Sequence, residues 1–294
     1  MQPEEPQTLI TGALGFVGRH LVKRMIENNE FPAIIVRDQS VIRARELFCE
    51  QVEIFTLGTL QGAAKELGIN EVINLAGFYT FGESPAETSA LIKSNIEFPA
   101  QILSIVAGLN PKLRWIQANT FMQHFSGSEF NPSCMYAATK QAMNCLLAFF
   151  EVKGAEVHHM VLPQIYGSND TRNKLINHLV AAAITGNAAS LSSGRQIMDL
   201  LHVDDVVDAI LIVRSHDTGS KTQLTSSDVL TIRELIRLVE QISGRTITAI
   251  FDVHNDRDRD IYEPWIVAPA PKGWSQNTDL TDWIHAEFEN ISPK

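Results

Sequence analysis

Short apolar runs alternate with stretches whose apolar residues recur at helical spacing along the first half of the chain. Residues 33–36, 52–56 and 71–75 are short runs rich in branched residues, which is typical of buried parallel strands. Residues 21–26 give the first helical pattern, directly after the apolar pair Leu9-Ile10. The alternation predicts an α/β fold, a doubly wound parallel sheet with right-handed crossovers.

The same patterns continue further along the chain. They predict a short helix over 62–67, a long helix over 86–107, a strand over 113–118 and an alanine-rich helix over 135–142. Residues 231–243 have apolar positions on one face and predict an amphipathic helix. Strand and helix patterns therefore alternate well past the first half of the sequence.

A glycine-rich segment, T-G-A-L-G-F-V-G-R-H, stands between the first strand and the first helix. In this context Gly12 allows a tight turn, Gly15 lets the backbone approach a pyrophosphate, and Gly18 lets the helix pack closely. Free N–H groups at the helix N-terminus favour phosphate binding. The spacing differs from the common G-x-G-x-x-G, and an ordinary glycine-rich turn is the alternative interpretation.

Arg37 closes the second predicted strand, followed by Asp38 and with Arg43 and Arg45 nearby. An acidic residue at this position of a dinucleotide fold bonds the adenosine ribose, whereas an arginine can receive a 2′-phosphate. The sequence therefore favours NADPH over NADH. The alternative is an exposed arginine at the end of a strand.

Three polar side chains suggest a reaction. Tyr136 and Lys140 are four residues apart and share one helix face, and Thr120 follows a predicted strand. A lysine ammonium near a phenol lowers a pKa that starts near 10. Tyr136 is thus a candidate general acid that protonates an alkoxide as hydride arrives. The spacing Y-x-x-x-K is common by chance, and the upstream hydroxyl and glycine turn strengthen it.

Composition narrows the classes of partner. The net charge of −10 argues against a nucleic-acid binder, and no segment approaches the roughly 20 apolar residues of a membrane span. The first six residues are acidic and lack a signal-peptide core. We expect a cytoplasmic protein without a metal site, in which His158-His159 is structural and three thiols stay reduced: Cys49, Cys134 and Cys145.

The ordered motifs resemble the extended short-chain dehydrogenases/reductases of the nucleotide-sugar epimerase/dehydratase family. They are Thr11–Gly18, Asn74–Gly77, Asn95, Thr120 and Tyr136–Lys140, followed by L-P-Q-I-Y-G over 162–167 and a longer segment over 194–206. The resemblance covers nearly the whole chain. It implies a Rossmann-type NADP-binding core over 1–163 and 196–215, a smaller C-terminal substrate-binding lobe over 164–195 and 216–294, and a homodimer formed through the helices that carry Asn95 and Tyr136.

A narrower subgroup matches further residues. The segments 122–125, 131–132, 136–142, 166–167 and 170–172, with Lys174, are similar to bacterial CDP-abequose and CDP-paratose synthases. Those enzymes are NADPH-dependent 4-ketoreductases of CDP-4-keto-3,6-dideoxyhexoses. The resemblance implies reduction of the C4 ketone of a nucleotide-linked deoxyhexose. A CDP-sugar is favoured on the resemblance alone, and a dTDP-sugar is the alternative.

The resemblance also implies residue roles. Tyr136 gives a proton to the C4 oxygen, and Lys140 lowers the pKa of Tyr136 and binds the ribose. Thr120 polarises the ketone, and Asn95 supports Lys140 through water. Cofactor contacts are expected from Gly12, Leu14, Gly15, Phe16, Val17, Gly18, Arg37, Leu57, Leu75, Ala76, Gly77, Tyr136, Lys140, Pro163 and Ile165. Substrate contacts are expected from Tyr79, Thr120, Gln123, His124, Tyr136, Arg172, Lys174, Arg195 and Arg257.

Three departures from the family pattern affect the interpretation. Thr120 replaces the commoner serine but keeps a hydroxyl donor. Phe121-Met122 stands where family dehydratases carry an Asp-Glu pair, which disfavours a 4,6-dehydratase. Met198 stands at a position where many relatives carry a pyrophosphate-binding arginine, and Arg172, Lys174, Arg195, Arg257 and Arg259 are the candidate replacements.

Several functions stay open at this level. A nucleotide-sugar 4-epimerase would hold NAD tightly, and a purified sample that carries NAD would favour it. A reductase of another carbonyl compound would share the same catalytic residues. A redox-sensing binding protein would keep the cofactor without the chemistry, but the presence of Thr120, Tyr136 and Lys140 disfavours it.

Overall fold

The computed structural model describes residues 7–49, 51–172, 174–216 and 219–289. The six N-terminal residues used in the signal-peptide argument lie outside these ranges. The contacts divide the chain into two compact units, one of residues 1–124, 129–161 and 217–222 and the other of residues 125–128, 162–216 and 223–294. The expected domain boundaries, which assign 196–215 to the core, stay a prediction.

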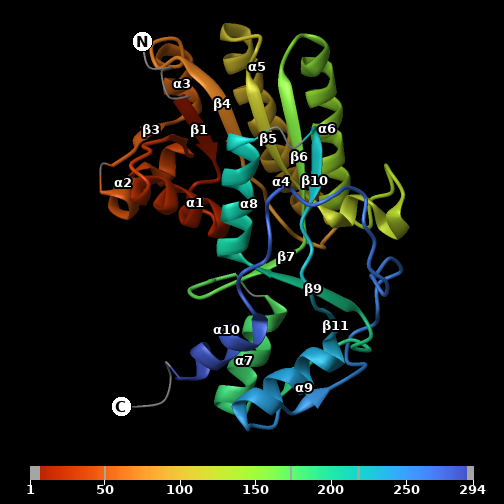
Figure 1. The fold of residues 1–294 in the computed structure, drawn as a ribbon. Helices are drawn as coiled ribbons and strands as arrows, with labels where there is room; N and C mark the ends of the chain where they lie inside the picture. Colours follow the sequence, from red (N-terminus) through yellow and green to blue (C-terminus); the bar gives the residue numbers. More distant parts are fainter. Residues whose placement is uncertain (1–6, 50, 173, 217–218, 290–294) are drawn as a thin grey trace. The chain divides into compact units, whose positions relative to one another are not determined.

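A seven-stranded sheet forms the centre of the first unit (Figure 1), in the order β10-β6-β5-β4-β1-β2-β3. The strands are β1 Gln7–Thr11, β2 Ala33–Ile35, β3 Glu53–Phe55, β4 Ile69–Asn74, β5 Arg114–Thr120, β6 Glu156–Leu162 and β10 Lys221–Gln223. Neighbouring strands from β3 through β5 pair in parallel. Strand order reverses between β1 and β4, which confirms the predicted Rossmann-type, doubly wound α/β fold.

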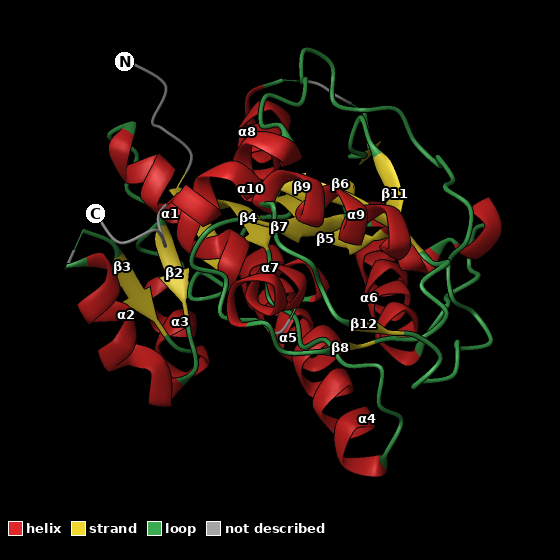
Figure 2. Ribbon diagram, turned by 90° about the horizontal axis from the view of Figure 1, so that it is seen from below, coloured by secondary structure: helices red, strands yellow, loops and turns green. Residues whose placement is uncertain are grey.

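Helices connect the strands of this unit. They are α1 Phe16–Glu27, α2 Val41–Phe48, α3 Leu57–Ala63, α4 Pro85–Ile92, α5 Phe98–Leu109 and α6 Met135–Val152. Side chains of α3, α5 and α6 join the strands in one apolar cluster that includes Leu60, Val106, Trp115 and Leu147. Figure 2 shows α5 and α6 on the same side of the strands. Burial of this cluster fixes the helices against the sheet.

Two helix predictions differ from the structure. The helix predicted over 62–67 is wrong, because α3 starts at Leu57, where the Thr59 hydroxyl accepts the N–H of Thr56, and ends at Ala63. The continuous helix predicted over 86–107 is interrupted by a π turn, η2 Lys93–Glu97. Such turns within helices often mark functional sites, and this one holds Asn95.

The second unit has its own small sheets and core. Strands β7 Gln164–Tyr166, β9 Ile197–His202 and β11 Val229–Thr231 form one sheet, and β8 Ala189–Ser190 pairs with β12 Ala249–Ile250. The longer helices are α7 Leu175–Thr185, α8 Val203–Ser215, α9 Ile232–Ser243 and α10 Leu280–Glu289. The amphipathic pattern at 231–243 corresponds to α9, which buries Leu235 and Val239 against Tyr166 and Trp283.

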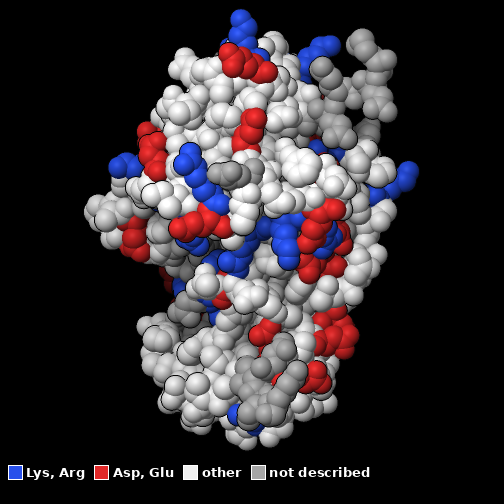
Figure 3. All heavy atoms as spheres, turned by 90° about the vertical axis from the view of Figure 1, so that its left-hand side faces the viewer, with Lys and Arg blue, Asp and Glu red and all other residues white. Residues whose placement is uncertain are grey.

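Surface charge and helix length bear on the expected partners. On the face shown in Figure 3, acidic side chains lie directly beside the basic ones. Within the described ranges, every helix is too short or too polar to cross a bilayer.

Candidate active site

The glycine turn between β1 and α1 is tightly packed. Gly12 has a φ of 70°, and a Cβ there would lie 2.6 Å from the Ala76 nitrogen. A Cβ at Gly18 would lie 2.2 Å from the Gly12 carbonyl oxygen. Gly12 and Gly18 are therefore required, because neighbouring backbone atoms lie where a Cβ would stand.

The same turn fits a pyrophosphate. Gly15 is exposed at the N-cap of α1, and the first turn of this helix holds no acidic residue. The first N–H groups of a helix have no intrahelical partner, and an anion can accept from them. Leu14 and Val17 are half-buried and Phe16 is buried. The geometry thus suits the dinucleotide expected here.

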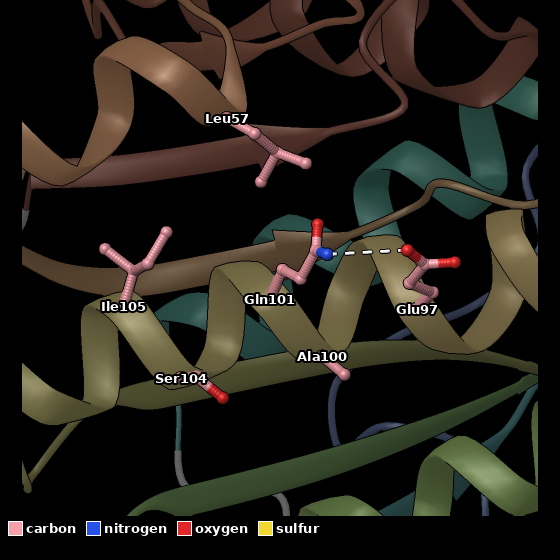
Figure 4. A pocket seen from close by; sticks show the side chains of 6 residues that line it. All are labelled: Leu57, Glu97, Ala100, Gln101, Ser104 and Ile105. Atoms are coloured by element: carbon pink, nitrogen blue, oxygen red, sulfur yellow. Dashed lines mark hydrogen bonds between the residues drawn. The ribbon is translucent and has the colours of Figure 1, made fainter.

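The expected adenosine contacts lie at neighbouring strand ends. Arg37 is exposed directly after β2, and Asp38 begins the short 3₁₀ helix η1 Asp38–Ser40. Leu57, at the start of α3, faces Gln101 of α5 across a shallow groove (Figure 4). The remaining lining residues are Glu97, Ala100, Ser104 and Ile105.

Buried polar side chains connect the glycine turn to the sheet. The Thr11 hydroxyl donates to Asn74 Oδ1 at 2.5 Å, and Asn74 Nδ2 donates to Gln117 Oε1 at 2.8 Å. The Ala76 N–H donates to Thr11 Oγ1 at 3.0 Å. This network crosses β1, β4 and β5 and fixes the relative positions of their ends, because each buried polar atom costs free energy without its partner.

Lys140, in α6, bonds to the backbone at the ends of β4 and β5. Its ammonium is buried and donates to the carbonyl oxygens of Ala76 at 3.3 Å and Ala118 at 3.1 Å. A Cβ at Gly77 would lie 3.3 Å from Lys140 Nζ, so the glycine leaves room for the ammonium. Burial lowers the pKa of Lys140 from its usual value near 10.5 to about 8.

The lowered pKa of Lys140 predicts a pH-dependent stability. The unfolded chain binds this proton up to about pH 10.5, whereas the folded chain releases it near pH 8. Between these values the unfolded state binds more protons, so the free energy of unfolding rises with pH. In Lys140→Met this rise, on the order of 3 kcal/mol, is expected to disappear. Urea unfolding at about pH 7.5 and about pH 10 measures it, and parallel curves for both proteins would contradict it.

Thr120 ends β5 with its hydroxyl available. The Thr120 N–H donates to Gln123 Oε1 at 2.9 Å, and Thr120 Oγ1 accepts from the Met122 N–H at 3.4 Å. Of the described residues, none accepts a hydrogen bond from the Thr120 hydroxyl. The hydroxyl can therefore donate to a substrate carbonyl.

Asn95 connects the loop after β4 to the helix that carries Tyr136. Asn95 Oδ1 accepts from the Phe78 N–H at 2.8 Å, and its Nδ2 donates to Thr139 Oγ1 at 2.9 Å. The Thr139 hydroxyl in turn donates to the Tyr136 carbonyl at 2.7 Å. The water-mediated role expected for Asn95 stays a prediction, whereas the direct bonds give it a second role in positioning α6.

Tyr79 lies against Tyr136. The two rings are 5.0 Å apart at 82°, an edge-to-face arrangement, and Tyr79 is 43% exposed. Tyr79 also contacts the ring of Phe81 at 5.4 Å. An aromatic surface therefore borders the phenol expected to do the chemistry.

The histidines near β5 and β6 are mostly buried. His124 is buried, and His159 Nδ1 lies 3.1 Å from Asn119 Nδ2. Burial lowers the pKa of His159 to about 4. His158 bonds to the Gly219 carbonyl and to Thr222. Both His158 and His159 thus have partners inside the first unit.

The other expected ligands lie in the second unit. Arg172 forms a bidentate ion pair with Asp170, at 2.7 and 2.8 Å. It also donates to the carbonyl of Ile165, in strand β7, which begins directly after Pro163. Burial lowers the pKa of Lys174 to about 8. Arg195 pairs with Asp256, Arg257 pairs with Asp260, and Arg259 lies 4.3 Å over the Phe125 ring. Asp256 and Asp260 thus accept hydrogen bonds from Arg195 and Arg257, respectively.

Sequence reasoning assigned no role to four polar residues of the first unit, although three of them, Asn74, Thr139 and Gln141, lie within the motifs it identified. Gln117 Oε1 accepts a hydrogen bond from Asn74 and so joins β5 to β4. Gln141 Oε1 accepts from Gln123, and Thr139 Oγ1 accepts from Asn95. Gln117 is fully buried between apolar neighbours in β5. A polar residue within an apolar strand pattern was the available signal, because a buried amide needs a partner.

The sequence model of the NAD dependent epimerase/dehydratase family matches residues 8–225. The chain belongs to this family. Among similar members are two proteins named CDP-abequose synthase, each 26% identical to the chain. The one from Yersinia pseudotuberculosis aligns over 82% of this chain and 86% of its own length, and the one from Salmonella typhimurium strain LT2 over 96% and 97%.

The fold of this family member is that of known epimerases. The UDP-glucose 4-epimerase of Thermus thermophilus, solved with NAD, superposes with a TM-score of 0.80 over 97% of this chain and 99% of its own, at 16% identity. The family assignment establishes a nucleotide-sugar-modifying enzyme of the NAD(P)-dependent oxidoreductase class.

Proposed function

We propose that the protein reduces the C4 ketone of a nucleotide-linked 4-keto-deoxyhexose with NADPH. The observation that carries the proposal is the arrangement of Thr120, Tyr136 and Lys140 beside a residue pair, Phe121-Met122, that cannot act as acid or base. An elimination of water needs a further acid and base at that position, whereas a ketone reduction needs only one proton donor, which Tyr136 provides.

The side chains divide the work of the reduction. Bound NADPH supplies the hydride. The Thr120 hydroxyl donates to the ketone oxygen, and Tyr136 gives that oxygen a proton as charge develops on it. Lys140, one helical turn from Tyr136, lowers the pKa of the phenol and reaches the ribose. Asn95 and Thr139 hold the start of α6 so that Tyr136 keeps its place.

Arg37 supports NADPH as the cofactor, because it stands where a ribose-binding acid would stand. In Arg37→Glu the KM for NADPH is expected to rise about 10-fold to 100-fold, since a charge-assisted bond to the 2′-phosphate is lost. The KM for NADH should stay within a factor of about 2. Initial rates with each cofactor measure the ratio. Lys153→Glu, the same charge change beyond α6, serves as the control, and an unchanged NADPH preference would remove Arg37 from the site.

The contacts to the nucleotide and its pyrophosphate are proposed from the sequence. They are Tyr79, His124, Arg172, Lys174, Arg195 and Arg257. The CDP nucleotide is supported by similarity to proteins named CDP-abequose synthase. Similarity to dTDP-glucose 4,6-dehydratases keeps a dTDP-sugar as the alternative.

A homodimer is part of the proposal. The outer surfaces of α4, α5 and α6 expose apolar side chains, namely Ile92, Leu109, Leu146 and Phe149. Apolar surface of this kind is typical of protein interfaces. Light scattering at micromolar concentration tests the assembly.

The activity test follows loss of NADPH absorbance with CDP-4-keto-3,6-dideoxyglucose and, in parallel, dTDP-4-keto-6-deoxyglucose. Turnover of either establishes the ketoreductase, and the preferred substrate identifies the nucleotide. If neither consumes NADPH or NADH, the reductase proposal fails. Copurified NAD would then support a 4-epimerase.

A further inference from the structure

Two glutamines, buried Gln123 and half-buried Gln141, join the segment of Thr120 to the helix of Tyr136. Gln123, in the 3₁₀ turn η3 Phe121–Gln123, is 0% exposed. Its Oε1 accepts the Thr120 N–H at 2.9 Å, and its Nε2 donates to Gln141 Oε1 at 3.1 Å. Gln141 follows Lys140 in α6. One amide therefore bridges the strand end and the catalytic helix.

The bridge restrains the backbone from which the Thr120 hydroxyl projects. Thr120 is the last residue of β5, and its N–H bonds to a side chain rather than to a neighbouring strand. Its Oγ1 accepts a long 3.4 Å bond from the Met122 N–H. The short bond from Thr120 to Gln123 is thus the stronger restraint on this residue, because hydrogen-bond strength falls with distance.

We propose that Gln123 and Gln141 act together as positioning residues that hold Thr120 at the distance from Tyr136 needed for both to reach one carbonyl oxygen. The inference rests on the proposed function, since it assigns the pair a role in that reaction. It gives Gln123 a role different from the substrate contact that the family resemblance implies, because the amide is buried and both of its ends bond within the protein.

The variants separate positioning from folding. Gln123→Met and Gln141→Met keep the approximate volume of each side chain and remove its bonds. Gln123→Glu is the rescue variant, because a protonated carboxyl accepts from the Thr120 N–H and donates to Gln141 Oε1, as the amide does. Gln276→Met is the matched control, because the Gln276 amide also bonds at both ends, from the Ser227 N–H and to the Thr278 carbonyl, within the second unit.

Two measurements, the rate of ketone reduction and the hydrogen exchange of the Thr120 amide, test the role of Gln123 and Gln141. We expect Gln123→Met to lower kcat about 10-fold to 100-fold, as misplacement of a reacting group does, with unchanged KM for NADPH. Gln141→Met should lower kcat similarly, and the double variant no further, because both substitutions break one bridge. Below about pH 6, where burial keeps the new carboxyl protonated, Gln123→Glu should recover most of the lost rate. Gln276→Met should match the parent protein.

Hydrogen exchange of the Thr120 amide, followed by NMR, needs no substrate. The amide should be protected in the parent protein and should exchange at least about 10-fold faster in Gln123→Met, while the thermal midpoints show both proteins folded. Unchanged exchange, or faster exchange with unchanged kcat, overturns the inference. If the parent protein reduces neither sugar, the proposed function fails and exchange alone decides whether Gln123 positions Thr120.

Discussion

Replacing Tyr136 with phenylalanine is expected to lower kcat about 100-fold to 10,000-fold, the usual contribution of a general acid. The ring that packs against Tyr79 is retained, and only the proton donor is lost. NADPH affinity should therefore change little, and the loss should appear in kcat rather than in KM. Single-turnover oxidation of NADPH in the presence of the keto-sugar measures the step directly.

Tyr166→Phe is the matched control for this prediction. It removes the same hydroxyl from a residue of the second unit that is fully buried and whose hydroxyl has no hydrogen-bond partner among the described residues. Its loss should leave kcat unchanged and leave the free energy of unfolding equal or higher. Full activity of Tyr136→Phe would contradict the assignment of the proton donor, and the alternatives of a different donor or a different reaction would then apply.

The second large effect is expected at Gly18. In Gly18→Ala the new Cβ meets the Gly12 carbonyl oxygen at 2.2 Å and the Ala13 Cα at 2.8 Å, both of them backbone atoms that cannot rotate away. Helix α1 must shift from the glycine turn, so the free energy of unfolding should fall by about 1–3 kcal/mol. Because the same N–H groups form the proposed pyrophosphate site, NADPH should bind at least about 10-fold more weakly.

Gly62→Ala provides a control of opposite sign. Gly62 lies within α3, where an added Cβ meets nothing within 4 Å. Alanine stabilises a helix interior by up to about 1 kcal/mol relative to glycine. Thermal unfolding with and without NADPH compares the two variants. Equal stability of both, with unchanged NADPH stabilisation, would show that the packing at Gly18 has no role in the site.

Local patterns in the sequence identified the parts of the molecule that depend on neighbouring residues. The glycine spacing predicted the turn before α1, because a positive φ at Gly12 and the close approach at Gly18 are backbone requirements. The Tyr136 to Lys140 spacing predicted a shared helix face, and the alternating apolar runs predicted the parallel sheet. The predicted bounds of α3 were wrong, because the start of this helix depends on the short connection from β3.

The π turn at Asn95 lay beyond these patterns. Residues 86–107 read as one helix, and the interruption at Lys93–Glu97 accompanies bonds from Asn95 to Phe78 and Thr139, residues 17 and 44 positions away in the chain. No local propensity contains those partners. The direct bonds that give Asn95 its positioning role exist only because the fold brings the loop after β4, η2 and α6 together.

The sequence by itself determined the family and the fold class and predicted the residue types of the proposed reaction, because these rest on spacing within single strands, turns and helices. The tertiary structure decided how the catalytic segments are held. The bridge from Thr120 through Gln123 to Gln141, and the bonds of buried Lys140 to the carbonyls of Ala76 and Ala118, join segments distant in the chain. Such bonds form only where folding excludes water and leaves each buried polar atom a protein partner.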